Sequence, residues 1–327
     1  MTIEAVLPLL ENARRILLTS HESPDGDAIG TELGLARILR DAGRDVAIWN
    51  HHATPPVYRA LPGADSIHVG PTPPPGFPDA FDLAVVLECP TLDRTGLEAR
   101  LSALPLVNID HHLGNSSYGV AAWVDVAAPA VAVLIAQVAR RLGWAIDPLA
   151  ASCLLVALAS DTGGFRFSNA TPAAFEAAAA LVRDGASPEL ASTWIHESQS
   201  EGSVRLLGEL LRTLVLHHEG RVATVHLTRA MFARAGAAAG DSEGLVDTPR
   251  SIAGVEAVAL LREVEEDVWK ISLRSRGDVD VQSIARRFDG GGHRNAAGCR
   301  AGGALEELRG RFASALAHAV EEAHRGA

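Results

Sequence analysis

Positive charge is scarce in this chain, and lysine is almost missing from it. The 327 residues include 29 Lys and Arg against 40 Asp and Glu, a formal net charge of −11 at pH 7, and Lys270 is the only lysine. This excludes the P-loop lysine, the protein-kinase lysine and Schiff-base chemistry elsewhere in the chain. Aromatic residues make up only 5%. Long single strands are normally bound by basic tracks with stacking aromatics, so we expect no binding of long nucleic acid.

Cysteines and long apolar runs are also scarce. The three cysteines form no C-x2-C pair, so the sequence predicts neither a disulfide framework nor a zinc ribbon. The apolar stretches are interrupted by acidic residues or proline before they reach the length of about 18 residues that a membrane span needs. No signal peptide is recognised. We expect a cytoplasmic protein that does not associate with a membrane.

The apolar pattern of the first half predicts an α/β fold. A chain of this length usually forms two domains. Continuous apolar runs, rather than alternating ones, predict strands that are buried on both faces of a mostly parallel sheet. Helical spacing predicts flanking helices, such as one over residues 28–42 that ends at Gly43. The predicted strands are 16–20, 46–49, 83–87 and 105–109, and the proline-rich segment 71–78 is predicted to be a loop.

The second half has a different texture. Residues 213–228 alternate around a Glu-Gly turn in the manner of a hairpin, and residues 268–273 alternate as another strand. These patterns predict a smaller, mixed α/β domain. We place a catalytic domain at 1–187, a helical linker at 188–215 and a substrate-binding domain at 216–327.

Four clusters of acidic residues and histidines follow apolar runs, and each of them alone would be a weak signal. Because ligands gather beyond the carboxyl ends of parallel strands, we expect the clusters to converge. Imidazole and carboxylate groups suit ions such as Mn2+, and two ions about 3.5–4 Å apart can hold the attacking and leaving oxygens of a displacement at phosphorus. The pattern therefore predicts a two-metal phosphoester site. The clusters are His21-x3-Asp25-x-Asp27, Glu88, Asp110-His111-His112, and Asp161 at the end of a predicted helix.

A local excess of positive charge lies near the C-terminus. Residues 274–300 contain six arginines and three aspartates, a balance of +3 in an otherwise acidic chain. Within this segment Gly290, Gly291 and Gly292 precede His293. Successive glycines allow backbone amides to approach an anion, so this segment is predicted to bind phosphate.

In order along nearly the whole chain, these motifs resemble those of the DHH phosphoesterases that carry a DHH-associated C-terminal domain. The subgroup that the chain resembles most is the nanoRNase and 3′-phosphoadenosine 5′-phosphate phosphatase type. The matching segments are 21–30, 110–112, 160–163 and 290–298, with weaker similarity at 50–52, 61–63 and 273–275.

The resemblance implies a set of metal ligands. One ion would be held by His21 and Asp25, a second by Asp27, His111 and Asp161, and both would be bridged by the carboxylate of Glu88. The family's usual residue at this last position is aspartate, and the glutamate is longer by one C–C bond of about 1.5 Å. The cofactor would be two divalent ions, Mn2+ in the first instance with Mg2+ or Co2+ as alternatives, and the nucleophile would be a hydroxide that bridges them.

The resemblance also implies roles around the substrate. His112 would donate to a phosphate oxygen, and Asp110 would orient His111. Arg274, His293 and the amides of Gly290, Gly291 and Gly292 would bind the substrate from the second domain, across a cleft between the domains.

These features favour short substrates, namely RNAs of a few nucleotides and nucleoside 3′,5′-bisphosphates, cleaved by a metal-dependent phosphoric ester hydrolase. A phosphodiesterase of cyclic or linear dinucleotides shares both motif sets and stays open. A manganese pyrophosphatase would grip its substrate with lysine and arginine, which a chain with one lysine does not favour. A RecJ-like exonuclease would bring further domains, for which 327 residues leave little room. A non-catalytic nucleotide-binding module would require that Glu88 disables the metal pair. The sequence leaves the oligomeric state open, including a homodimer.

Overall fold

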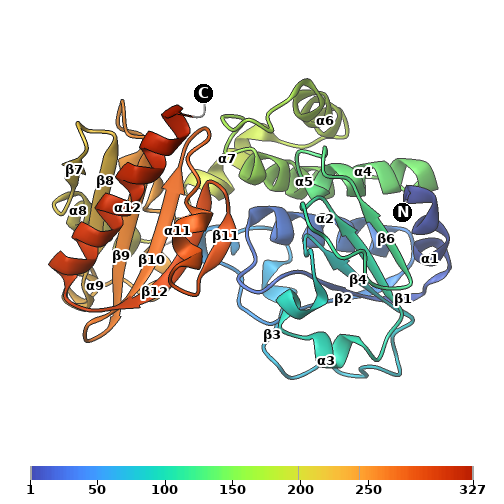
Figure 1. Ribbon diagram of the computed structural model, residues 1–327. Coiled ribbons are helices and arrows are strands. Elements are labelled where there is room, and N and C mark those ends of the chain that lie inside the picture. Colours follow the sequence, from blue (N-terminus) through green and yellow to red (C-terminus); the bar gives the residue numbers. More distant parts are fainter. Residues whose placement is uncertain (1, 198, 243, 326–327) are drawn as a thin grey trace. The chain divides into compact units, whose positions relative to one another are not determined.

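The chain divides into two compact units, Met1–Ser198 and Gln199–Ala327 (Figure 1). The computed structural model describes residues 2–197, 199–242 and 244–325, with the backbone alone at residues 196 and 293. The segment predicted as a linker, 188–215, contains a helix that packs within the first unit and another that packs within the second. The predicted domain limits at residues 187 and 216 stay a prediction.

The first unit is built on a parallel sheet of largely buried strands. They are β1 (Arg15–Thr19), β2 (Asp45–Asn50), β3 (His68–Val69), β4 (Leu83–Leu87), β5 (Leu106–Asp110) and β6 (Ala121–Val124). They lie in the order β3-β2-β1-β4-β5-β6, and all neighbours run parallel. The order reverses between β1 and β4, where open sheets of this type bind ligands beyond the strand ends. The predicted strands and the mostly parallel sheet are confirmed.

Helices cover both faces of this sheet, as its apolar strands require. The helices are α1 (Leu7–Asn12), α2 (Gly26–Asp41), α3 (Glu98–Leu101), α4 (Val131–Leu142), α5 (Pro148–Asp161), α6 (Pro172–Arg183) and α7 (Pro188–His196), with 3-10 turns at Ile3–Ala5, Pro56–Tyr58, Ala64–Ser66 and Leu92–Thr95. Alternate strand residues pack against α2, α4 and α5 on one face. The others, such as Leu17 and Val86, pack with Leu101 of α3 on the opposite face. The helix predicted over 28–42 is confirmed, and 71–78 is a loop.

Glycines on one face of α2 allow it to lie very close to α5. A Cβ atom added at Gly30 would lie 2.6 Å from the carbonyl oxygen of Cys153, and one at Gly34 would lie 2.7 Å from the Leu154 side chain. Such distances are shorter than any ordinary contact, so larger residues would push the two helices apart. Because Asp27 is on α2 and Asp161 is the last residue of α5, this close packing positions two of the predicted site residues.

The second unit has a mixed sheet, as the alternating patterns predicted. Its strands are β7 (Val215–His217), β8 (Val222–Leu227), β9 (Ala257–Glu265), β10 (Val268–Ser275), β11 (Gly291–His293) and β12 (Ala296–Gly302). The order is β11-β12-β10-β9-β8-β7, in which β8 and β9 are parallel and the other neighbours are antiparallel.

Helices cover both faces of the second sheet too. They are α8 (Glu201–Leu211), α9 (Arg229–Ala235), α10 (Asp247–Arg250), α11 (Gln282–Arg286) and α12 (Leu305–Arg325), with a 3-10 turn at Ala239–Ser242. One face packs against α11 and α12, and the other packs against α8 and α9. Phe288, just after α11, packs against Phe312 of α12 with ring centroids 4.8 Å apart. Among the described residues, no helix is both long and apolar enough to cross a membrane.

Candidate metal centre

Besides a group formed by Glu88, His111 and His112, two groups of histidine and carboxylate side chains gather in the first unit, around the ends of β1, β4 and β5. Within each group, one ligand atom from every residue lies within 4.8 Å of the others. The six residues are those that the sequence predicted as metal ligands, and the structure brings them together three by three. Their binding of metal stays a prediction. The first group is His21, Asp25 and Glu88, and the second is Asp27, His111 and Asp161.

Glu88 lies between the two groups. Its Oε2 is 3.5 Å from Nε2 of His21, and its Oε1 is 3.0 Å from Nε2 of His111. The side chain is buried, and Oε2 has no hydrogen-bond partner within the described structure. Burial raises the pKa of Glu88 well above its usual range, although the hydrogen bond with His111 opposes this. A buried carboxylate oxygen without a partner is costly, and a cation between Glu88 and His21 would remove that cost.

Asp27 is buried and held by three donors. It accepts hydrogen bonds from the Thr31 hydroxyl at 2.8 Å, from the Val131 amide at 2.6 Å and from the Ala132 amide at 3.3 Å. The last two are the first amides of α4, whose own N-cap residue Ala130 supplies no side-chain acceptor. Asp27 therefore caps a helix that begins far away in the sequence, and its oxygens are fixed in position. Burial raises the pKa of Asp27, and the charge of His111 opposes this.

The two histidines after β5 have different partners, and one expectation about them is wrong. We expected Asp110 to orient His111. Instead, Nδ1 of His111 lies 2.9 Å from the carbonyl oxygen of Ala128, and Asp110 accepts a hydrogen bond from Nδ1 of His112 at 2.9 Å. In extended backbone, side chains two residues apart point to the same side, so Asp110 meets His112 rather than its immediate neighbour. A proton on Nδ1 of His111, donated to Ala128, leaves Nε2 able to bind a metal.

Acidic groups are crowded at the second ligand group. Burial alone would lower the pKa of His111, but Glu88, Asp27 and Asp161 raise it to about 11. The pKa of Asp161 is raised to about 7, first by burial and then by the charge of Asp27. Several carboxyl groups this close together in a buried site favour the binding of a cation between them. The imidazole and carboxylate donors are ones that Mn2+ and similar divalent ions accept, so the residues fit a metal centre.

The carboxyl group of Asp110 behaves differently from the others. Burial would raise its pKa, but hydrogen bonds from His112 and Asn115 outweigh this and lower it. The Asn115 amide donates at 2.6 Å. Asp110 therefore stays ionised, and its hydrogen bond fixes the orientation of the His112 ring. No motif or spacing in the sequence indicated a role for Asn115.

Sequence reasoning also missed Glu22 and the contacts of two histidines. Spacing alone showed no carboxylate near His51 and His52, yet Glu22, His51 and His52 each offer a ligand atom within 4.8 Å of the others. Glu22 Oε1 is 3.1 Å from Nδ1 of His51. The Ser23 amide donates to Nδ1 of His52 at 3.0 Å, so that this nitrogen already has a donor. The charged residue is brought there by the fold rather than by local sequence.

Glu32 is a second residue that the sequence did not single out. It is a fully buried acid in the middle of α2. The Asn50 side-chain amide donates to Glu32 Oε2 at 2.8 Å, and Asn50 Oδ1 accepts from the Ser20 amide at 3.3 Å. Ser20 and Asn50 directly precede His21 and His51. Glu32 thus ties together the ends of β1 and β2. An acid spaced four residues from Ala28 and from Ala36 on an apolar face was the available signal.

The predicted substrate residues of the second unit are only partly accessible for that role. Arg274, on β10, is half-buried, and its Nη1 donates to the Leu273 carbonyl at 3.0 Å. The Gly290 amide donates to the Ala285 carbonyl at 3.0 Å, which corrects the expectation that it faces an anion. Gly291 and Gly292 are exposed. A side chain at Gly290 or Gly292 would overlap the backbone of β12, so close strand packing accounts for these glycines. The side chain of His293 lies outside the described structure.

Comparisons with known proteins show which families the two halves of the chain match. Residues 15–158 match the model of the DHH family, N-terminal domain, and residues 221–322 match that of the DHHA1 domain. A bifunctional oligoribonuclease and PAP phosphatase NrnA from Thermus thermophilus is 35% identical over 291 residues, 86% of this chain and 83% of that protein. The protein of the same name from Bacillus subtilis is 28% identical over 288 residues, 86% of this chain and 88% of its own.

A solved structure resembles the whole chain. The crystal structure of an exopolyphosphatase-related protein from Bacteroides fragilis superposes with a TM-score of 0.88 at 28% identity, over 96% of this chain and 95% of that one. The agreement extends over both sheets.

Proposed function

Because the chain belongs to the DHH family and carries a C-terminal DHHA1 domain, we propose that it is a metal-dependent phosphoesterase that hydrolyses short RNAs and nucleoside 3′,5′-bisphosphates. The observation that carries this proposal is the position of Glu88 between the two ligand groups, with one oxygen directed to each. The similarity to oligoribonuclease and PAP phosphatase proteins over most of the chain supports the choice of substrates.

Six residues would hold two divalent ions, Mn2+ in the first instance. His21, Asp25 and Glu88 would bind one ion. Asp27, His111 and Asp161 would bind the other, with Glu88 shared between the two. When bound, such ions would lower the pKa of a coordinated water and neutralise charge on the phosphate.

The remaining residues would position the ligands and move protons. The Ala128 carbonyl fixes the ring of His111, and the amides of α4 fix the carboxylate of Asp27. Asp110 is ionised and holds the Nδ1 proton of His112. It would thereby hold the His112 ring in place to donate a hydrogen bond to a phosphate oxygen or to the leaving oxygen.

Residues of the second unit would bind the rest of the substrate. Gly291 and Gly292 present exposed backbone in a segment with a local excess of arginine. We assign substrate binding to these amides together with His293 and Arg274. Gly290 would contribute by holding β11 close to β12 rather than through its amide.

The test is product formation by the purified protein with Mn2+ on five substrates. These are 3′-phosphoadenosine 5′-phosphate, a linear RNA dinucleotide, a cyclic dinucleotide, a long single-stranded RNA and pyrophosphate. We expect mononucleotide or phosphate from the first two, complete loss of product with a chelator, and little product from the last two. Mg2+ and Co2+ replace Mn2+ in parallel assays to rank the metals.

Each other result points to a different assignment. Cleavage of the cyclic dinucleotide alone would make the chain a cyclic-dinucleotide phosphodiesterase. Cleavage of pyrophosphate alone would make it a pyrophosphatase. Nucleotide binding without turnover at any metal concentration would mean that Glu88 disables the metal pair and that the chain is a binding module.

A further inference from the structure

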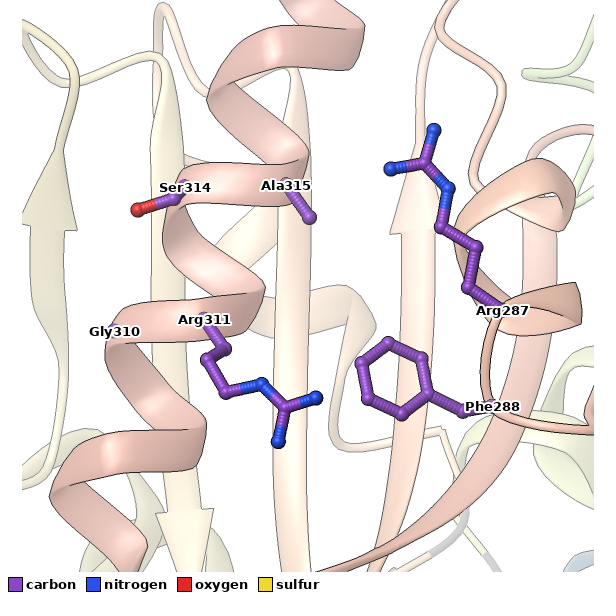
Figure 2. A pocket seen from close by; sticks show the side chains of 6 residues that line it. All are labelled: Arg287, Phe288, Gly310, Arg311, Ser314 and Ala315. Carbon is purple, nitrogen blue, oxygen red and sulfur yellow. The ribbon is translucent and has the colours of Figure 1, made fainter.

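An open hollow lies on the second unit between α11 and α12. Its volume is about 560 Å3. Sites for small ligands usually measure about 300–1,000 Å3, so the hollow has room for a nucleotide. Two of the described residues that line it are arginines and none is acidic. The lining residues are Arg287, Phe288, Gly310, Arg311, Ser314 and Ala315 (Figure 2).

The aromatic ring in this hollow holds one of the arginines in place. The Arg311 guanidinium lies over the ring of Phe288. The ring of Phe288 in turn packs against that of Phe312, with ring centroids 4.8 Å apart. Figure 2 shows Arg311 reaching from α12 toward Phe288 and Arg287 extending from the end of α11. A guanidinium that stacks on a ring keeps its N–H donors in its own plane, where they can bind phosphate oxygens in pairs.

Neither arginine is engaged by an acid. In the portions of the chain that the structure describes, no ion pair involves Arg287 or Arg311. Arg309, on the same helix as Arg311, pairs instead with Glu306, so an acidic partner is available to other arginines of α12. Two exposed and unpaired guanidinium groups in a chain of net charge −11 are a local site for an anion.

The hollow is joined rigidly to the glycine segment to which we assign substrate binding. The Phe288 amide donates to the Ala285 carbonyl at 2.9 Å, and the Gly290 amide donates to the same carbonyl at 3.0 Å. One tight turn at the end of α11 therefore carries both Phe288 and the start of β11. The hollow and the glycine segment therefore belong to the same unit and are connected through this turn.

We propose that Arg287 and Arg311 bind backbone phosphates of RNA nucleotides beyond the reacting phosphodiester. The inference rests on the proposed function, because it takes short RNA as the substrate. A nucleoside bisphosphate has no further phosphodiester, so its hydrolysis does not use the hollow. The two arginines thus determine how strongly RNAs longer than a dinucleotide are preferred.

The test compares the double variant Arg287→Glu/Arg311→Glu with Arg286→Glu in the full-length protein. Arg286 is exposed and adjacent in sequence, but it does not line the hollow, so its variant controls for the reversal of one nearby charge outside the hollow. On an RNA of several nucleotides we expect the double variant to raise KM by about tenfold, the effect of losing a charged hydrogen bond or two. On a dinucleotide and on 3′-phosphoadenosine 5′-phosphate, kcat/KM stays within about twofold of the wild type, which corresponds to less than one ordinary hydrogen bond.

RNA binding without turnover separates this inference from the proposed function. Anisotropy of a labelled RNA is measured with chelator-treated protein over a range of salt concentrations. For single strands, each lost phosphate contact reduces the slope of log K against log salt by about 0.7. We expect a reduction of about 1.4 for the double variant, which loses two such contacts, and none for Arg286→Glu. This measurement is valid even if the wild type hydrolyses nothing.

Three results would overturn the inference. One is an unchanged salt slope in the double variant, and another is an equal loss in Arg286→Glu, which would indicate a general effect of charge. The third is a matching loss on the bisphosphate, which would place the arginines at the reacting site. If the charge reversals unfold the protein, as judged by thermal unfolding, Arg287→Gln/Arg311→Gln replaces them with the same expected direction.

Discussion

The carboxylate of Asp27 accepts a hydrogen bond from the Val131 amide at 2.6 Å, so that one side chain is a member of a ligand group and the cap of α4. Removing this side chain would therefore have two effects that can be measured separately. The effect on stability needs no metal, whereas the effect on turnover does.

We expect Asp27→Ala and Asp161→Ala both to abolish turnover, but to differ in stability. Without its cap, α4 has two unsatisfied amides, which costs about 1–2 kcal/mol of the free energy of unfolding. Among the described side chains, the Asp161 carboxylate accepts a hydrogen bond from that of Asn169 alone, at 3.2 Å, so its loss costs less. Urea unfolding in the presence of a chelator checks this difference. Equal midpoints would mean that Asp27 does not stabilise α4, and more than a few per cent of wild-type turnover in either variant would remove that residue from the proposed ligands.

We expect Glu88→Asp to lower metal affinity and turnover. The shorter side chain withdraws the carboxylate by about 1.5 Å from the nitrogens of His21 and His111, which lie 3.5 and 3.0 Å from its oxygens. Glu88→Gln serves as a control that keeps the length and removes the charge. Calorimetric titration with Mn2+ measures the affinity. Higher activity in Glu88→Asp would show that the glutamate is a weakened bridge.

Metal binding is expected to release protons. In the metal-free protein, His111 holds its proton at neutral pH because its pKa is about 11, and Asp161 holds part of one because its pKa is about 7. Both must lose their protons to bind a metal, so the affinity rises with pH. Titration in buffers of different ionisation enthalpy gives the number of protons released, and we expect about one or more. The Asp161→Ala variant should release fewer, and an absence of release would contradict the ligand assignment.

Glu32→Gln is expected to remove a pH-dependent loss of stability. Burial raises the pKa of Glu32 from its ordinary 4.5 to about 8. The folded protein therefore holds this proton more tightly than the unfolded chain does. The stabilisation of the fold by this bound proton is complete below pH 4.5 and is lost as the pH rises toward 8. The variant cannot ionise, so it should gain on the wild type by at most about 1.4 kcal/mol per pH unit in that window. Unfolding in chelator measures this gain, and Glu176→Gln on the exposed surface of α6 should show none.

Gly30→Ala is expected to weaken both the fold and the metal centre. Its Cβ would lie 2.6 Å from the Cys153 carbonyl oxygen and would push α2 away from α5, which separates Asp27 from Asp161. Gly208→Ala, in α8, is the matched control, because a Cβ there meets nothing within 4 Å. That control should gain about 0.5–1 kcal/mol of stability, since alanine suits a helix better than glycine. Unchanged Mn2+ affinity in Gly30→Ala would show that the close packing does not position the ligands.

The sequence predicted what depends on local pattern and on the order of motifs. Continuous apolar runs predicted the buried strands, and helical spacing predicted that Asp161 lies at the end of a helix, which is α5. The resemblance to the DHH family is confirmed by the comparisons. Contacts between distant segments could not be predicted. Asp27 and Val131 are 104 positions apart, and neither residue type indicates the other.

Contacts within a motif can also differ from those that residue order suggests. Three consecutive residues, Asp110, His111 and His112, suggested that the acid serves the nearest histidine. Side chains alternate along extended backbone, so Asp110 accepts a hydrogen bond from His112, two residues on, instead. Likewise, the glycines at 290 and 292 suggested an anion site. The structure shows that close approach of two strands is sufficient to require them.

The strand order of the first sheet has a consequence for how this centre can change. β1 and β4 are neighbours, but from β1 the sheet grows toward β2 and from β4 it grows toward β5. His21 and Glu88 are therefore anchored side by side, while the connections that follow them diverge. An insertion after either residue lengthens a connection that leads away from the other. Loop length on the two sides of the centre can accordingly drift independently among relatives, and new substrate contacts can be added on one side without moving the ligands on the other.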